Sequence, residues 1–441
     1  MDRGFKIGFW GILPQLFIIV SLLCWINVAG QQTTKNEKKS LKKSADKSIP
    51  DSFIYKLLAS YPDFFNSIIS RKEELNIQII YTQIDRGKKS KAKLSDHSFN
   101  LNPENYYYPA STVKLPVAIL ALQKLNELKI RGLDRNSTMI TLADGNIQSE
   151  VCNDPSAADG RPSIAHYIKK ILLISDNDAF NRLYEFLGQE YINSSLHKMG
   201  YADVQIIHRL NIFLTEEQNR HTNPVKFIDT SGKIVYDKPA EKSRLVYAPR
   251  NTKIGNGYMK GGELVNEPLD FSKKNRLSLS DLHTIVKSIM FPDAVTEKQR
   301  FNLTADDYAF LRKYMSMVPG ESISPVYDSV DYWDSYVKFL FYGAEKGKHD
   351  PDIRIFNKPG DAYGFLIDAA YIADYKNNIE FMVSAVIYCN NDGILNDDKY
   401  DYETLGLPFL KNLGMVLYDY ELKRDRKYKP DFSTLLFQYL D

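Results

Sequence analysis

The sequence predicts a mixed α/β (α+β) domain in which an antiparallel sheet is flanked by helices, together with an all-helical subdomain and an inserted lobe of loops and hairpins. Apolar residues at helical spacing fill the middle of the chain, at about 111–128, 164–173 and 178–187. The last third instead holds strand-like runs at 354–357, 363–373 and 379–388. A five-residue connection joins the last two runs, which predicts that they pair antiparallel.

The folded domain opens with a helix and a strand. Apolar residues recur at helical spacing over 53–69, and a β-branched run over 77–84 ends at Asp85, Arg86 and Gly87. We expect the next helix to begin near Ser111, to tolerate Pro116 because it lies close to the start, and to run through Leu128, with Gly132 as the stop signal.

The region from about 205 to 275 differs from what surrounds it. Short strand-like runs at 225–228 and 234–236 flank a turn sequence, which predicts hairpins. We interpret 205–275 as an inserted lobe. Helical periodicity returns at 281–290 and 306–317, with Ser280 and Thr304 as expected N-caps, and again at about 402–420.

The first fifty residues have a different composition. Residues 1–30 hold early basic residues and an apolar stretch at 7–29, the pattern of an export signal. That stretch is also long enough to remain as a membrane tether, since roughly 20 apolar residues span a bilayer. Residues 31–50 are rich in lysine and serine and form a predicted linker, and 51–441 form the predicted folded domain. The sequence thus predicts an exported protein, periplasmic or associated with the cell envelope.

Composition excludes several function classes. With 44% hydrophobic and 25% charged residues the chain can build a full core. A formal net charge of +2 gives no extended basic field, so a nucleic-acid partner is not expected. The seven histidines show no zinc-binding spacing, and we expect neither a metal nor another cofactor.

Three short motifs carry the chemistry, in the order Ser111-Thr112-Val113-Lys114, Ser175-Asp176-Asn177 and Lys358-Pro359-Gly360. Residues three apart share a helix face, so Lys114 can bring its amine to the Ser111 hydroxyl and accept its proton if the amine is neutral. The first motif opens a predicted helix, the second lies between two helices, and the third ends a strand. This order and context give the set its specificity.

Together these motifs resemble the SxxK, SDN and KTG set of class A β-lactamases and penicillin-binding proteins. The resemblance implies a β-lactamase-like fold with an antiparallel sheet of about five strands, and Ser111 as the nucleophile beside Lys114. It implies that Ser175 relays a proton to the leaving nitrogen and that Asn177 holds the substrate amide and braces Lys114. The N–H groups of Ser111 and Asp361 would form the oxyanion hole. Lys358 would attract a substrate carboxylate and help to keep Lys114 neutral, and Gly360 would let the substrate approach the strand edge.

The sequence departs from the family pattern at two places. Pro359 stands where the family has a threonine or serine, which removes a hydroxyl that would bind a substrate carboxylate. A direct match also puts Leu214 or Thr215 where class A enzymes carry the glutamate that activates the deacylating water. Glu216 or Glu217 could replace that glutamate only in a remodelled loop.

We therefore expect a serine hydrolase that opens a β-lactam or a peptide-like amide, a small-molecule substrate, through an acyl-enzyme on Ser111. One alternative is a D-Ala-D-Ala peptidase or related amidase with slow deacylation, which Pro359 and the missing glutamate favour. The other is a non-catalytic cell-envelope binding module on the same fold, which predicts that Lys114 points away from Ser111.

Overall fold

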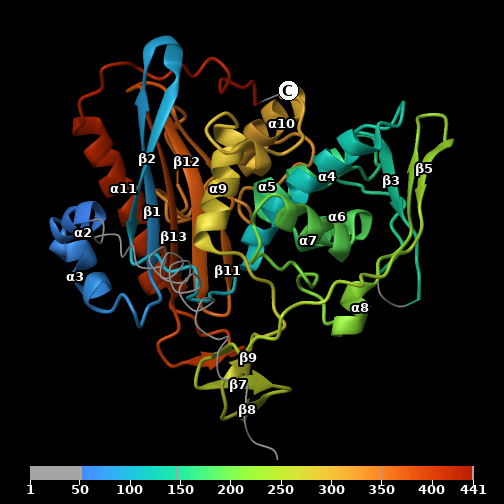
Figure 1. Cartoon of the computed structure of the whole chain (residues 1–441), viewed down its shortest axis with the longest axis horizontal. Coiled ribbons are helices and arrows are strands. Elements are labelled where there is room, and N and C mark those ends of the chain that lie inside the picture. Colours follow the sequence, from blue (N-terminus) through green and yellow to red (C-terminus); the bar gives the residue numbers. More distant parts are fainter. Residues whose placement is uncertain (1–51, 146–147, 348, 440–441) are drawn as a thin grey trace, which may run out of the picture. The chain divides into compact units, whose positions relative to one another are not determined.

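A six-stranded antiparallel sheet forms the centre of the computed structural model, which describes residues 52–145, 148–347 and 349–439 (Figure 1). Its strand order is β10-β12-β13-β1-β2, and the short β11 also pairs with β12. The strands are β1 (Gln78–Arg86), β2 (Ala92–Phe99), β10 (Ile353–Asn357), β11 (Gly360–Ala362), β12 (Phe365–Asp374) and β13 (Ile379–Tyr388). β12 and β13 are almost entirely buried, which explains their nearly unbroken apolar sequences.

The predicted hairpin between β12 and β13 is confirmed. Asp374 of β12 faces Ile379 of β13 across the turn, and Asn378 has a left-handed backbone with φ of 57°. The structure adds β2, which the sequence analysis missed. β2 is an edge strand with mostly half-exposed residues, so its sequence lacks the apolar run that marks the inner strands.

Helices cover both faces of the sheet (Figure 1). One face packs against α2 (Ser52–Ala59), α3 (Pro62–Ser70) and α11 (Leu407–Lys423), and the other packs against α9 (Leu279–Met290) and α10 (Ala305–Ser316). The single helix expected over 53–69 is wrong, because the chain breaks at Ser60 and Tyr61 and Pro62 starts a second helix. Thr304 caps α10 as predicted, whereas Ser278, not Ser280, caps α9.

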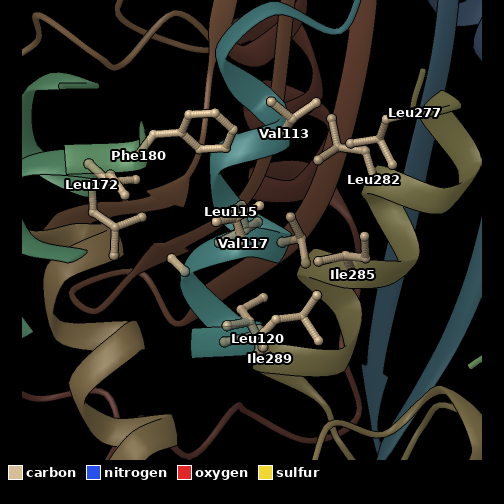
Figure 2. Close-up of a cluster of buried hydrophobic side chains, with 14 of the residues drawn as sticks. Val113, Leu115, Val117, Leu120, Leu172, Phe180, Leu277, Leu282, Ile285 and Ile289 are labelled. Carbon is tan, nitrogen blue, oxygen red and sulfur yellow. The ribbon is translucent and has the colours of Figure 1, made fainter. Parts of the chain in front are cut away.

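The all-helical subdomain comprises α4 (Lys114–Leu128), α5 (Ile164–Ile174), α6 (Asn177–Leu187) and α7 (Gln189–Lys198). Figure 2 shows side chains of α4 such as Val117 lying between Phe180 of α6 and Leu282 of α9, so α4 is enclosed by helices on more than one side. The α-helix starts later than predicted, because residues Ala110–Val113 form a 3-10 turn, η2. Its end at Leu128 is confirmed, and the residue that closes it is Lys129, in a left-handed conformation with φ of 52°, rather than Gly132.

Residues 205–275 hold one short helix and six short strands: α8 (Glu216–Arg220), β4 (Val225–Ile228), β5 (Ile234–Lys238), β6 (Lys253–Ile254), β7 (Gly257–Lys260), β8 (Glu263–Val265) and β9 (Leu269–Asp270). Two of these strands pair with strands outside that range. β4 pairs with β3 (Thr138–Thr141), and β7 pairs with β14 (Ile394–Leu395). The region is therefore tied both to the helical subdomain and to the loop that follows β13.

The remaining elements are short. They are three 3-10 turns and a π-helical turn before α11: η1 (Lys88–Ser90), η3 (Glu297–Gln299), η4 (Pro319–Glu321) and η5 (Tyr402–Gly406). The predicted signal or tether at 1–30 and the linker at 31–50 lie outside the described residues. In the part of the chain that the structure describes, no helix has the length and apolar character needed to cross a bilayer.

Candidate active site

Ser111 and Lys114 lie side by side at the start of α4. Ser111 sits in the 3-10 turn and Lys114 is the first residue of the α-helix, so both side chains leave the same face. The Lys114 Nζ is 2.9 Å from the Ser111 Oγ. Lys114 is fully buried, with 0% of its surface exposed. The amine is therefore close enough to take the hydroxyl proton and is shielded from water.

The second motif forms the tight connection between α5 and α6. Ser175 has a left-handed backbone with φ of 61° and closes α5, and Asp176 caps α6 by accepting a hydrogen bond from the Ala179 N–H at 2.7 Å. This turn aims polar atoms at α4. Lys114 Nζ donates to Asn177 Oδ1 at 2.7 Å and also to the Ser175 carbonyl, and it lies 3.1 Å from the Ser175 Oγ. Asn177 thus braces Lys114, as expected.

The third motif reaches the same group of atoms from the sheet. Lys358 lies between β10 and β11, and its Nζ donates to the Ser175 Oγ and to the Pro359 carbonyl, both at 2.8 Å. The Ser175 hydroxyl therefore lies between the amines of Lys114 and Lys358. Lys358 is fully buried and its donors are turned toward protein atoms. Its amine contributes a positive electrostatic field to the site, but it is not exposed for contact with a substrate carboxylate.

Gly360 packs against the turn that carries Ser111. A Cβ at this position would lie 2.8 Å from the Ser111 nitrogen and 2.9 Å from the Thr112 nitrogen. The glycine is therefore required because β11 packs directly against the backbone of the 3-10 turn, and the close approach is between two parts of the protein. Asp361 is the next residue of β11, and the role of its N–H in an oxyanion hole with that of Ser111 stays a prediction.

Burial lowers the pKa of both lysines. Burial, followed by the charge of Lys358, holds the pKa of Lys114 well below its usual range. Burial lowers the pKa of Lys358 to about 7, against the opposing influence of Asp361 and Asp368. A neutral amine beside the serine is what proton abstraction needs.

A pocket of about 540 Å³ opens over these groups. Ser111, Ser175 and Asn177 line it, with Asp361 from β11. Further lining residues come from loops that the sequence analysis did not single out, among them Tyr108, Leu210, Asn211, Tyr336, Asp398 and Tyr400. These residues belong to no short motif and are far apart in the sequence, so no local pattern marks them.

Glu216 and Glu217 lie on α8 and do not line this pocket. Glu216 pairs with Lys273 at 2.8 Å and with Arg220 at 3.3 Å, and Glu217 pairs with Lys242 and His221. Hydrogen bonds from Lys273 and Lys242 lower the pKa values of the two carboxyls. The structure thus does not bring either candidate base together with Ser111.

Several solved structures resemble this chain. A β-lactamase from Sphaerobacter thermophilus has 11% sequence identity and a TM-score of 0.42, over 83% of this chain and 97% of that one. An acyl-enzyme complex of the penicillin-binding protein PBP-A with penicillin G has 14% identity and a TM-score of 0.44, over 83% and 96%. A class A β-lactamase from Clostridium kluyveri has 13% identity and a TM-score of 0.41, over 81% and 98%. No curated protein matches the sequence.

A family model supplies the assignment. The model described as the β-lactamase enzyme family matches residues 63–303, which is more than half of the 441 residues. The matched span includes the first two motifs and ends before Lys358. The chain belongs to the β-lactamase enzyme family.

Proposed function

We propose that this protein is an exported serine hydrolase that forms an acyl-enzyme on Ser111 with β-lactams or peptide-like amides. Membership of the β-lactamase family supports a serine hydrolase. The observation that carries the more specific proposal is the 2.9 Å approach of the buried Lys114 amine to the Ser111 hydroxyl. Export rests on the sequence pattern of residues 1–30.

Acylation follows from the positions of these groups. Neutral Lys114 takes the Ser111 proton as the Oγ attacks the amide carbonyl carbon, and the N–H groups of Ser111 and Asp361 hold the developing oxyanion. The C–N bond then breaks. The proton held by Lys114 passes to the leaving nitrogen through the Ser175 hydroxyl, 3.1 Å away, which leaves an ester on Ser111. The amine is released from a peptide-like amide and stays attached to the acyl group of an opened β-lactam.

Release of the acyl group is the slower half of the proposed reaction. Hydrolysis of the ester needs a water activated by a base. The two glutamates considered for that role lie on α8, where Glu216 pairs with Lys273 and Arg220 and Glu217 pairs with Lys242. Pro359 also removes the hydroxyl expected to bind a carboxylate. We therefore favour the penicillin-binding type of behaviour, with acylation and slow deacylation, over rapid antibiotic hydrolysis.

The orientation of Lys114 argues against the non-catalytic alternative. A binding module that had lost its chemistry would not need to keep a buried lysine against a serine, since burying an amine is unfavourable. Here the Lys114 Nζ approaches Ser111 and is held by Asn177.

Labelling with a fluorescent penicillin tests the proposal. The wild-type protein should form a covalent adduct, and both Ser111→Ala and Lys114→Met should reduce the labelling rate by about a thousandfold. Lys124→Met is the matched control, because Lys124 is a half-buried lysine of the same helix, with a pKa lowered to about 8, and does not line the pocket. Equal labelling of the Ser111→Ala variant would reject the mechanism.

The fate of the adduct distinguishes the two enzymatic possibilities. After excess probe is removed, slow loss of the label over minutes to hours supports a penicillin-binding enzyme. Immediate loss, with rapid turnover of the chromogenic cephalosporin nitrocefin, would identify a β-lactamase instead.

A further inference from the structure

Two carboxylates without partners face the pocket that contains Ser111. Asp361 follows Gly360 on β11, and Asp398 lies in the loop after β14; both are exposed and line the pocket. Neither carboxylate forms a hydrogen bond or an ion pair with another described residue. By contrast, many other acidic side chains of this protein, such as Asp203 and Glu321, are paired with arginine.

No positive group in the described structure balances these two charges at the pocket surface. The lining residues include no lysine, arginine or histidine. Lys114 and Lys358 lie beneath the surface, and their amines are already bonded to protein oxygens. Lys274 contacts the ring of Tyr363, with its Nζ 5.6 Å from the ring centre, but lines a different pocket. A negatively charged substrate would therefore meet two carboxylates and no accessible cation.

The surroundings of Asp361 make pairing with a cation favourable. Loss of water around this carboxyl raises its pKa, while Lys358 and Lys114 lower it. Part of the Asp361 surface stays exposed, but a carboxylate that has lost some of its water and gained no hydrogen bond is held at a free-energy cost. A substrate ammonium group beside it would recover that cost, and the nearby rings of Tyr108, Tyr336 and Tyr400 can pack against its apolar stem.

We propose that this pocket selects amides that carry a cationic amine near the scissile bond, with Asp361 as the main selecting group and Asp398 as the second. The inference names the substrate class of the site and rests on the function proposed above. It also accounts for Pro359, because a site that takes a cation has no use for a hydroxyl directed at a carboxylate.

A charge series built on one β-lactam tests this selection. Benzylpenicillin, its methyl ester and its 2-aminoethyl ester share a ring and carry a charge of about −1, 0 and +1 at the same carboxyl position. The acylation rate constant should rise along the series by about tenfold for each unit of charge, and less in high salt. In Asp361→Asn most of this difference should disappear, and Asp398→Asn should remove a smaller part.

Two controls keep the outcomes distinct. Asp293→Asn, which changes an aspartate with 95% side-chain exposure away from the pocket, should keep the full series. Equilibrium binding of the three compounds to Ser111→Ala measures charge preference without any acylation. Absence of an adduct with wild-type protein would reject the acyl-enzyme function alone. A flat or reversed order of binding to Ser111→Ala would overturn the selection by Asp361, whatever the labelling shows.

Discussion

Lys114 is the residue on which the chemistry depends, because its position is unfavourable for a charged amine and suited to a neutral one. Its pKa is lowered first by burial and then by Lys358. The sequence motif predicted the Ser111–Lys114 pair, since residues three apart share a helix face. It did not predict the position of Lys358 beneath the pocket, because that position depends on how the sheet packs against η2.

The lowered pKa of Lys114 predicts how labelling responds to pH. The rate should rise as the amine loses its proton, with a midpoint well below the pKa of about 10.4 of an ordinary lysine. Lys358→Ala removes a positive neighbour, which raises the pKa of Lys114, so the midpoint should move to higher pH. Lys358→Arg keeps the charge and should leave the midpoint lower than in the alanine variant. The measurement is the labelling rate across pH, and an unchanged midpoint in Lys358→Ala would contradict this electrostatic coupling.

At the scale of elements, the site depends on the contact between β11 and η2. The turn that carries Ser111 and the strand that carries Asp361 come from distant parts of the sequence and touch through Gly360. The motif marked Gly360 as a residue where the substrate could approach, but not as the contact with η2. A local motif cannot show which backbone will approach a glycine, because that approach is a property of the tertiary packing.

Gly360→Ala should therefore slow acylation by more than the addition of a single methyl group suggests. The new methyl group would lie 2.8 Å from the Ser111 nitrogen, so the turn must shift. We expect a loss of about 1–3 kcal/mol in the free energy of unfolding. We also expect about a hundredfold slower acylation, because small displacements at a reacting centre are costly. Gly87→Ala is the control, since its Cβ would lie at an ordinary 3.5 Å from the Lys91 carbonyl. Equal labelling rates for the two variants would show that the β11–η2 contact does not position the nucleophile.

Elements were predicted where a local sequence pattern marks them. The connection between α5 and α6 and the β12–β13 hairpin were found because capping residues and turn residues mark them locally. β2 was missed because an edge strand need not be apolar, and the break at Ser60 was missed because Phe53 to Ile69 keeps an apolar pattern across it.

Across the whole molecule, a buried ion pair ties residues 205–275 to the helical subdomain. Arg209 and Glu185 of α6 form a two-pronged pair at 2.6 and 2.9 Å, and neither side chain is exposed. The next residue, Leu210, exchanges hydrogen bonds with Asn181 of α6, both at 2.9 Å. Because Leu210 and Asn211 line the pocket, this network fixes one of its walls.

Glu185→Gln should destabilise the protein by about 3–5 kcal/mol, because it leaves the guanidinium of Arg209 buried without a charged partner. Chemical denaturation measures the effect. Asp293→Asn breaks an exposed pair with Arg300 and should leave stability unchanged. If the two variants unfold at the same denaturant concentration, the Arg209–Glu185 pair does not hold the structure together.

The sequence predicted the layers of the molecule more fully than it predicted the pocket. Helices and strands can be predicted from the periodicity of apolar residues, whereas the lining residues Tyr336 and Asp398 lie in loops outside the three motifs. A role for the carboxyl group of Asp361 was not predicted, for another reason. Only its backbone N–H was expected to act, and the charge balance of the pocket becomes visible only when all of its walls are known.

Mass mapping of the penicillin adduct tests the central claim most directly. Proteolysis of the labelled wild-type protein should yield one modified peptide, with the added mass of the intact β-lactam on Ser111, and Ser111→Ala should yield none. An adduct on another residue, or undiminished amide hydrolysis by Ser111→Ala, would contradict the claim that this serine is the nucleophile.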